Sequence, residues 1–167
     1  MANVRLTALA RPAAVALALA AAPAAADPPA ARAAEEAARR QFEDWRLACG
    51  PSDCAIRGAV LGAAGAPVLR VAATPERLTF ATSLPLFLPD GLVLTLGDAP
   101  PRVVPWRTCG PAGCVAEAAL DPDLLAGLKR EREAEAVLTL VDGVRVRLPV
   151  SLLGFTAAWR AMGAVSP

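Results

Sequence analysis

Histidine and tyrosine are both absent from this 167-residue chain, and each absence excludes a kind of site. Histidine is the commonest general base and the commonest metal ligand, so a serine–histidine triad and a histidine-ligated metal are excluded. Tyrosine is one of the side chains that most often stack or hydrogen-bond in binding clefts. A large net charge is also lacking, because 17 basic and 16 acidic residues leave only +1. No strong field therefore exists to recruit nucleic acid or an anionic membrane.

The N-terminal segment has the pattern of a secretory signal peptide. Arg5 and Arg11 precede an apolar run over 12–22, and small residues then lead to an Ala-Ala-Ala sequence that ends at Ala26. A positive start, a short apolar centre and an A-x-A ending are typical of such peptides. The run is about half the ~20 residues that a membrane-spanning helix needs. We therefore expect a signal peptide over 1–26, cleavage after Ala26, and export to the periplasm or the outer envelope with no membrane span in the mature chain.

Residues 27–41 have the composition of a linker. Their sequence contains no large apolar side chain, so they can bury too little surface to offset the entropy lost on ordering. A frayed alanine-rich helix is the alternative for this stretch. The residues that form cores are concentrated from Phe42 onward. We expect a linker over 27–41 and a single β-sandwich domain over 42–167, which is an ordinary domain size.

From Phe42 onward, short apolar segments are separated by Gly, Pro and Asp, which is typical of strands joined by tight turns. Over 144–148, apolar and polar side chains alternate, as a half-buried strand requires. Just before it, Asp142 and Gly143 predict a hairpin with a type I′ turn. Many short strands that recur every ~8–12 residues predict a mainly β sandwich or barrel. The predicted strands are Asp44–Cys49, Cys54–Leu61, Val68–Ala73, Leu78–Leu84, Leu92–Leu96, Val103–Cys109, Cys114–Ala119, Ala136–Val141 and Val144–Val150.

Two short helices are predicted in addition to the strands. Over 121–132, Asp121 is a suitable N-cap, a proline follows it, and basic residues suit the end of the helix. Near the C-terminus, Phe155, Trp159 and Met162 fall on one face of a helix. Such an apolar stripe is typical of packing against a core rather than of a ligand site.

The four cysteines lie in two matching Cys-Gly-Pro-x-x-Cys turns between predicted strands. Glycine and proline favour a reversal that brings two cysteines within the ~4.4–6.8 Å Cα separation of a disulfide. We therefore predict the disulfides Cys49–Cys54 and Cys109–Cys114. A pairing between the two turns stays open, because the larger ring stabilises by about 4 kcal/mol against about 2 for a local one. Zinc binding and thioredoxin-like chemistry are disfavoured by export and by the absence of a C-x-x-C sequence.

No arrangement of residues predicts a catalytic, cofactor-binding or metal site. The acids are scattered over predicted turns and helix ends, and the glycine-containing loop at 62–65 lacks the Lys and Ser/Thr of a phosphate loop. We therefore predict no catalytic residue and no cofactor. Two alternatives stay open. One is a hydrolase of envelope polymers that uses two carboxylates about 5–10 Å apart in a cleft, and the other is a carrier of a small molecule inside the sandwich.

Five segments occur in one order along the chain: Phe42–Trp45 followed by a cysteine, Leu84–Gly91, Cys109–Glu117, Asp121–Leu128 and Leu148–Phe155. Together they resemble the invasion-associated locus B family of bacterial exported proteins. The resemblance implies an immunoglobulin-like β-sandwich in the bacterial envelope and a link to host-cell interaction, and it implies no catalytic residues. Two departures are a tighter first cysteine turn and Leu153, which stands where a lysine often precedes Gly-Phe.

We therefore expect an exported, non-enzymatic binding or structural protein whose partner is an envelope or host protein. A small exported sandwich without a catalytic grouping motivates this expectation. Such domains often bind through edge strands or end loops.

Overall fold

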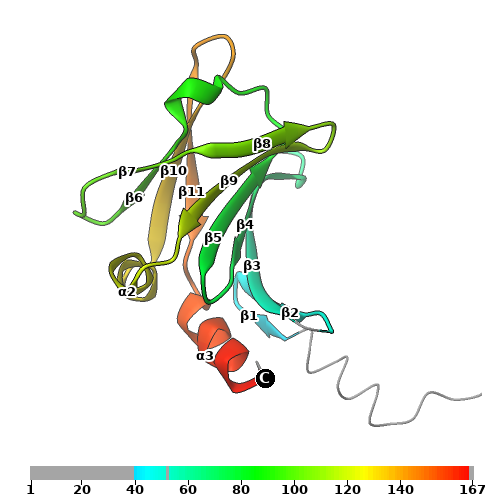
Figure 1. The fold of residues 1–167 in the computed structure, drawn as a ribbon, viewed down its shortest axis with the longest axis vertical. Helices are drawn as coiled ribbons and strands as arrows, with labels where there is room; N and C mark the ends of the chain where they lie inside the picture. Colours follow the sequence, from blue (N-terminus) through cyan, green and yellow to red (C-terminus); the bar gives the residue numbers. More distant parts are fainter. Residues whose placement is uncertain (1–39, 52, 166–167) are drawn as a thin grey trace, which may run out of the picture.

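Two antiparallel sheets form a sandwich in the computed structural model, which describes residues 40–51 and 53–165 (Figure 1). The mainly β sandwich predicted from the strand pattern is confirmed. The signal peptide expected over 1–26 and the cleavage at Ala26 lie outside the described residues, as does most of the linker expected over 27–41. The last linker residue, Gln41, already belongs to a strand, because it pairs with Arg46.

The larger sheet has seven strands in the order β1-β2-β3-β4-β5-β9-β8. The first five strands follow one another along the chain, and β9 then pairs with β5 and brings β8 to the far edge. The strands are β1 (Gln41–Phe42), β2 (Trp45–Cys49), β3 (Cys54–Leu61), β4 (Pro67–Ala73), β5 (Arg77–Thr82), β8 (Trp106–Gly110) and β9 (Gly113–Ala119).

The smaller sheet has four strands in the order β11-β10-β6-β7. A short 3₁₀ helix, η1 (Leu88–Asp90), precedes it along the chain and was not predicted. The strands are β6 (Leu92–Leu96), β7 (Arg102–Val104), β10 (Glu133–Thr139) and β11 (Arg145–Ser151).

Helix α2 (Pro122–Arg130) begins as its sequence predicts. The carboxylate of Asp121 accepts a hydrogen bond from the Leu124 N–H at 2.8 Å, which caps the helix start. The helix ends before residue 132, because Glu131 is already extended. No helix in the described part of the chain is long and apolar enough to cross a membrane.

Helix α3 (Phe155–Val165) covers one end of the sandwich, below the sheets in Figure 1. Phe155 and Met162 are buried in the core, as predicted from their spacing. Trp159 is only half-buried and stacks on Phe155 with the ring centroids 5.9 Å apart. The Lys129 ammonium lies 5.4 Å from the Trp159 ring centroid, so a cation–π contact links α2 to α3.

Trp45 of β2 joins the large sheet, the small sheet and α3. Its side chain is fully buried and meets the Phe155 ring edge to face, with centroids 4.9 Å apart. Its Nε1–H donates to the Ser151 carbonyl at the end of β11, at 2.9 Å. Gly58 of β3 leaves room for the indole, because a Cβ there would lie 3.2 Å from the ring. Four elements therefore depend on one side chain.

Two disulfides join Cys49 to Cys54 and Cys109 to Cys114, which is the local pairing that the sequence favours. In each pair the cysteines are direct partners on neighbouring antiparallel strands, with Cα atoms 4.0 Å apart. One bridge joins β2 to β3 and the other joins β8 to β9. Each disulfide therefore closes a hairpin near an outer edge of the large sheet.

The single strand predicted over 103–109 is wrong, because the chain changes sheets within it. Strand β7 ends at Val104 in the small sheet, and β8 begins at Trp106 in the large one. Pro105 lies between them and has no N–H to donate to either ladder. The proline therefore marks the point where the chain crosses between the two layers.

The hairpin predicted at Asp142 and Gly143 is present, but its turn is not type I′. Only Gly143 has a positive φ, of 83°, whereas a type I′ turn needs positive φ at both central residues. The Gly143 N–H donates to the Leu140 carbonyl, and the Leu140 N–H donates to that of Val144. This is the three-residue loop in which a type I turn is followed by glycine. The Asp142 carboxylate accepts from the Val144 N–H at 3.0 Å and so holds the loop in this form.

The strand predicted over 78–84 ends at Thr82, which is buried. The Thr82 hydroxyl donates to the Val68 carbonyl at 2.7 Å and accepts from the Leu84 N–H at 3.2 Å. These two bonds replace the ladder bonds that a longer strand would make.

Gly58→Val tests the contact between β3 and the Trp45 ring. The added side chain would press on an indole that Phe155 and the Ser151 carbonyl hold in place, so we expect the free energy of unfolding to fall by about 1–3 kcal/mol. Ala59→Val is the matched control on the exposed face of the same strand, and its effect should stay within about 0.5 kcal/mol. Denaturant unfolding measures both, and equal effects would contradict the account.

Peptide mapping under non-reducing conditions tests the two disulfides. We expect one linked peptide to carry Cys49 with Cys54 and another to carry Cys109 with Cys114. Exchanging both cysteines of either pair for serine should lower the free energy of unfolding by about 2 kcal/mol, the value for a six-residue ring. A peptide that linked Cys49 to Cys109 or Cys114 would overturn the assignment.

Asp121 supplies a prediction about pH. The hydrogen bond from Arg102, at 2.5 Å, and that from the Leu124 N–H hold the pKa of this carboxyl below its usual value of 3.8. Because the folded pKa is lowered, the ionised group stabilises the fold above its unfolded pKa, and this contribution is lost as the pH falls through the folded pKa. Asp121→Asn keeps a capping side chain but loses the charge.

We therefore expect Asp121→Asn to unfold slightly more easily than the parent protein at pH 7. The difference should vanish at a pH well below 3.8, where both side chains are neutral. Urea unfolding at the two pH values measures it, and a difference that did not change with pH would show that the charge plays no part.

Candidate functional site

An open hollow of about 710 Å³ lies on the outer face of the large sheet. Strands β1 to β5 line it, and the turn that joins β1 to β2 forms one rim. In Figure 1, β2 and the end of β3 beside it curve away from the small sheet, so this face is concave. The hollow combines exposed charged side chains with a floor of small ones, and we take it as the candidate site.

Strand alternation decides which side chains face the hollow. On β3, Ile56 is buried in the core, whereas Arg57 and Ala59 are exposed on the outer face. On β4, Leu69 is buried and Arg70 is exposed. The core residues on the inner face therefore fix the outward direction of the arginines.

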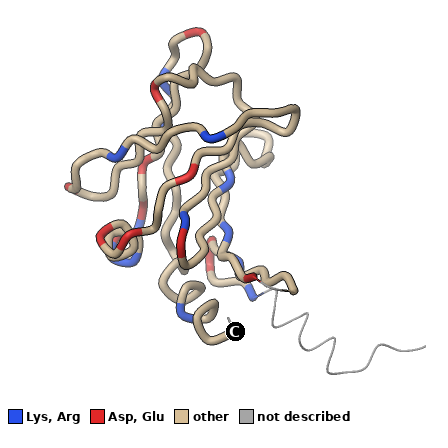
Figure 2. The backbone as a smooth tube through the Cα atoms, in the orientation of Figure 1, with Lys and Arg blue, Asp and Glu red and all other residues tan. Residues whose placement is uncertain are grey.

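Three arginines form a row across adjacent strands: Arg46 on β2, Arg57 on β3 and Arg70 on β4, all lining the hollow. Arg46 and Arg57 are direct cross-strand partners. Arg70 is opposite Ala59, the next residue on the same face of β3, so it is a diagonal neighbour of Arg57. All three are exposed, and none takes part in the ion pairs found among the described residues. Figure 2 shows basic positions succeeding one another down these strands.

The pair of Arg46 and Arg57 has an electrostatic cost. Like charges directly opposite each other on a sheet destabilise it, because their Cβ atoms lie only about 4.5–5.5 Å apart. Water and salt weaken this repulsion at an exposed site. A bound anion would remove it, so the row has the electrostatics of an anion-binding surface.

The disulfide Cys49–Cys54 sets this register, although no cysteine lines the hollow. Each step back along β2 from Cys49 is matched by one step forward along β3 from Cys54. Three such steps bring Arg46 opposite Arg57. Sequence reasoning missed the arginine pair, yet the predicted disulfide and strand alternation together contained the signal that would have found it.

The rim turn is tied to the connection between β11 and α3. The Asp44 carboxylate accepts a hydrogen bond from the Ser151 hydroxyl at 2.5 Å, and the Asp44 N–H donates to the Leu153 carbonyl at 3.3 Å. Gly154 has a φ of 84°, and a Cβ there would lie 2.0 Å from the Phe42 carbonyl oxygen. Only glycine therefore lets the turn approach this closely, and the rim is held in a fixed position.

Two of the segments behind the family resemblance, Phe42–Trp45 and Leu148–Phe155, thus contact each other. Trp45 meets both Ser151 and Phe155, and Asp44 meets Ser151 and Leu153. Together these contacts hold the rim turn and α3 against the sandwich. Leu153 stands where the family pattern led us to expect a lysine, and its contact with Asp44 is made by the backbone carbonyl and not by the side chain.

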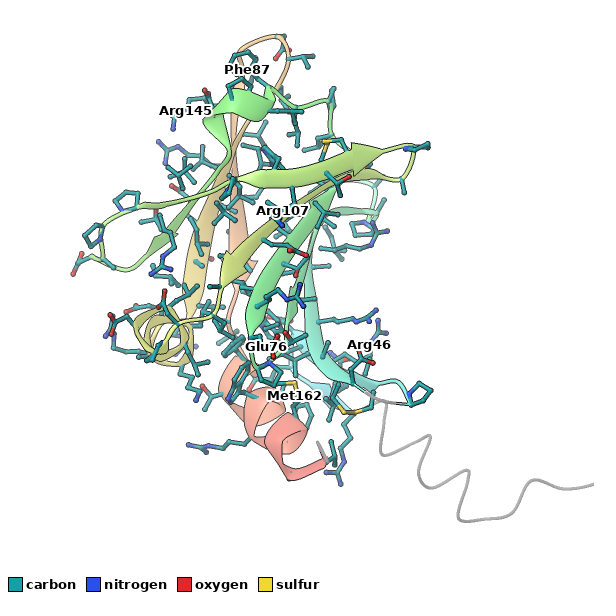
Figure 3. All side chains as sticks on the ribbon, viewed as in Figure 1. Arg46, Glu76, Phe87, Arg107, Arg145 and Met162 are labelled. Atoms are coloured by element: carbon teal, nitrogen blue, oxygen red, sulfur yellow. A yellow bond between two sulfur atoms is a disulfide. The ribbon has the colours of Figure 1, made fainter. Side chains whose placement is uncertain are left out.

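Two further arginines lie on the outer face, but they have an acid between them. Glu117 of β9 has its carboxylate 3.9 Å from Arg77 of β5 and 3.9 Å from Arg107 of β8. Figure 3 labels Arg46, on β2 next to one edge of the large sheet, and Arg107, on the opposite edge strand β8. Positive charge near β8 is thus partly neutralised, whereas the row on β2, β3 and β4 is not.

The acids do not form a facing pair in the hollow. Glu43 and Asp44 are the only acids among its described lining residues, and both belong to the same rim turn. The Asp44 carboxylate is held by the Ser151 hydroxyl. Among the described residues, no group of three or more cysteines and acids is placed to hold a metal ion. Among the described lining residues, no further acid faces these two across the hollow.

A second open hollow, of about 400 Å³, lies between the β6–β7 connection and α2. Its lining is mainly aliphatic, with Leu94, Leu124 and two prolines, Pro100 and Pro101. It faces solvent, whereas the carrier alternative requires space enclosed between the sheets. Its lining also includes Arg102 and Arg130, but these arginines form ion pairs with Asp121 and Glu131, unlike the row on the large sheet.

The family model of the invasion associated locus B (IalB) protein matches residues 53–163. Among solved structures, the crystal structure of invasion associated protein B from Bartonella henselae is similar, with a TM-score of 0.69 and 18% sequence identity. The match covers 76% of this chain and 96% of that one, and at this identity it shows the fold. No match to a curated protein was found. Since the family model covers well over half of the sequence, the chain belongs to the invasion associated locus B family.

Proposed function

We propose that the protein is an exported, non-enzymatic binding protein of the bacterial envelope, and that the hollow on its large sheet is the contact surface. The observation that carries the proposal is the row of three exposed arginines over a floor of small side chains. Guanidinium groups can bind a partner through hydrogen bonds, and alanine side chains leave room for it. Neither is a good acid, base or nucleophile at neutral pH. The hollow is thus suited to contact rather than to chemistry.

Two features support export. Disulfides persist in oxidising compartments such as the bacterial periplasm, and both cysteine pairs of this chain are joined. The N-terminal residues also have the charge and hydropathy pattern of a signal peptide. We propose that the mature protein is periplasmic or associated with the outer envelope.

The partner that we propose is a protein of the envelope or of a host. A concave face about five strands wide can hold an extended segment of another chain, and its rigid backbone suits recognition without rearrangement. The Bartonella henselae protein is named for an association with invasion. If this chain shares that association, its partner is a protein on the surface of a host cell.

Ala59→Trp tests whether the hollow is the contact surface. Ala59 is exposed and lines the hollow, so an indole there would fill the space above β3 without entering the core. We expect binding of the partner, captured by crosslinking in envelope extract, to fall at least tenfold, or by about 1.4 kcal/mol.

Ala119→Trp is the matched control, because Ala119 is exposed on the same sheet but does not line the hollow. It should leave capture unchanged, and both variants should keep the parent thermal stability. If Ala59→Trp captured the partner as well as the parent protein did, the hollow would not be the contact surface.

A further inference from the structure

We propose that the hollow recognises an extended protein segment with acidic side chains at alternate positions, and that Arg46, Arg57 and Arg70 each pair with one of its carboxylates. This inference rests on the proposed function and names the chemistry of the partner. Three separate observations lead to it: the spacing of the arginines, the small size of the floor, and the acids on the rim.

The spacing of the row fits an extended peptide. Direct cross-strand neighbours such as Arg46 and Arg57 have Cβ atoms about 4.5–5.5 Å apart, and diagonal neighbours such as Arg57 and Arg70 about 7–8 Å. In an extended chain, side chains on one face recur every two residues, or about 6.5–7 Å. A segment that crosses β2, β3 and β4 can therefore place successive same-face carboxylates against successive arginines.

The pairing itself is chemically specific. A guanidinium group offers two parallel N–H donors that match the two oxygens of a carboxylate. Carboxylates paired with Arg46 and Arg57 would also remove the repulsion between those two charges. Recognition here depends on the fork of the arginine and not on positive charge alone.

The floor allows the backbone of a partner to approach closely. Between and beside the arginines lie the small side chains of Ala59, Ala72 and Ala81. Strand β5 adds one polar side chain to the floor, that of Thr79. At one end, Leu61 is 61% exposed beside Pro67 and offers an apolar contact. Small and apolar surface of this kind suits the alternate side chains of a peptide better than a heavily hydrated polymer.

The rim argues against a uniform polyanion. Glu43 and Asp44 place negative charge at one side of the hollow, and the whole chain carries a net charge of only +1. A nucleic acid or a sulfated polysaccharide carries closely spaced charges along its length and would be repelled at this rim. A peptide can carry acids over the arginine row and neutral or basic residues at the rim.

The experiment uses the mature protein and a synthetic peptide of about ten residues, the length of a long strand, in which glutamate alternates with threonine. Binding is measured by calorimetry at low ionic strength, where exposed charge pairs are least screened. We expect the peptide to bind. Its counterpart with glutamine in place of glutamate should bind at least tenfold more weakly.

Arginine variants then locate the site. Arg57→Gln should weaken binding of the glutamate peptide about tenfold, and Arg57→Lys, which keeps the charge but loses the fork, should weaken it by a smaller factor. Arg145→Gln is the matched control, because Arg145 is an exposed arginine at the start of β11 in the other sheet. It should bind like the parent protein.

Other outcomes would overturn the inference. It is wrong if Arg145→Gln weakens binding as much as Arg57→Gln does, or if the glutamine peptide binds as well as the glutamate peptide. It is also wrong if a sulfated polysaccharide binds through the same arginines more tightly than the peptide. If Ala59→Trp blocks capture of the natural partner while Arg57→Gln does not, the proposed function stands and only the acidic character of the partner is disproved.

Discussion

The packing of Trp45 is the constraint on which the rest of the structure depends. Its indole is fully buried, touches Phe155 of α3, donates to the end of β11 and rests against the backbone at Gly58 of β3. The contacts with Phe155 and with the Ser151 carbonyl join parts of the chain that are more than 100 residues apart in sequence. The inner face of β2 and β3 packs around this ring. The side chains on the outer face are therefore not needed for the core. The candidate site is thus on the opposite face of the strands that pack against Trp45.

The same contacts explain why the hollow keeps its shape. Residues of the rim turn are bonded to the β11–α3 connection through Asp44, and the register of β2 against β3 is fixed by the disulfide Cys49–Cys54. The backbone of a surface held in this way loses little conformational entropy when a partner binds. Core residues and the arginines of the proposed contact surface therefore alternate along the same strands.

Much of the fold could be predicted from the sequence, because its signals are local. Alternation located nearly all the strands, the Cys-Gly-Pro turns gave the pairing found in the structure, and Asp121 marked the start of α2. The features that the sequence did not predict depend on contacts between residues far apart in the chain. Pro105 was read as part of one strand, since nothing local shows that two layers meet there. The hollow was missed because its depth depends on the bend of the sheet and on the docked rim.

The central claim is that the outer face of β2, β3 and β4 binds an acidic extended segment. Mapping amide chemical shifts of the labelled protein during titration with such a segment tests it most directly. The account predicts that the largest changes fall on the strand residues around Arg46, Arg57 and Arg70 and at the rim turn. Changes concentrated instead beside α2, or at the exposed loops around Phe87 and Val141 at the other end of the sandwich, would contradict it.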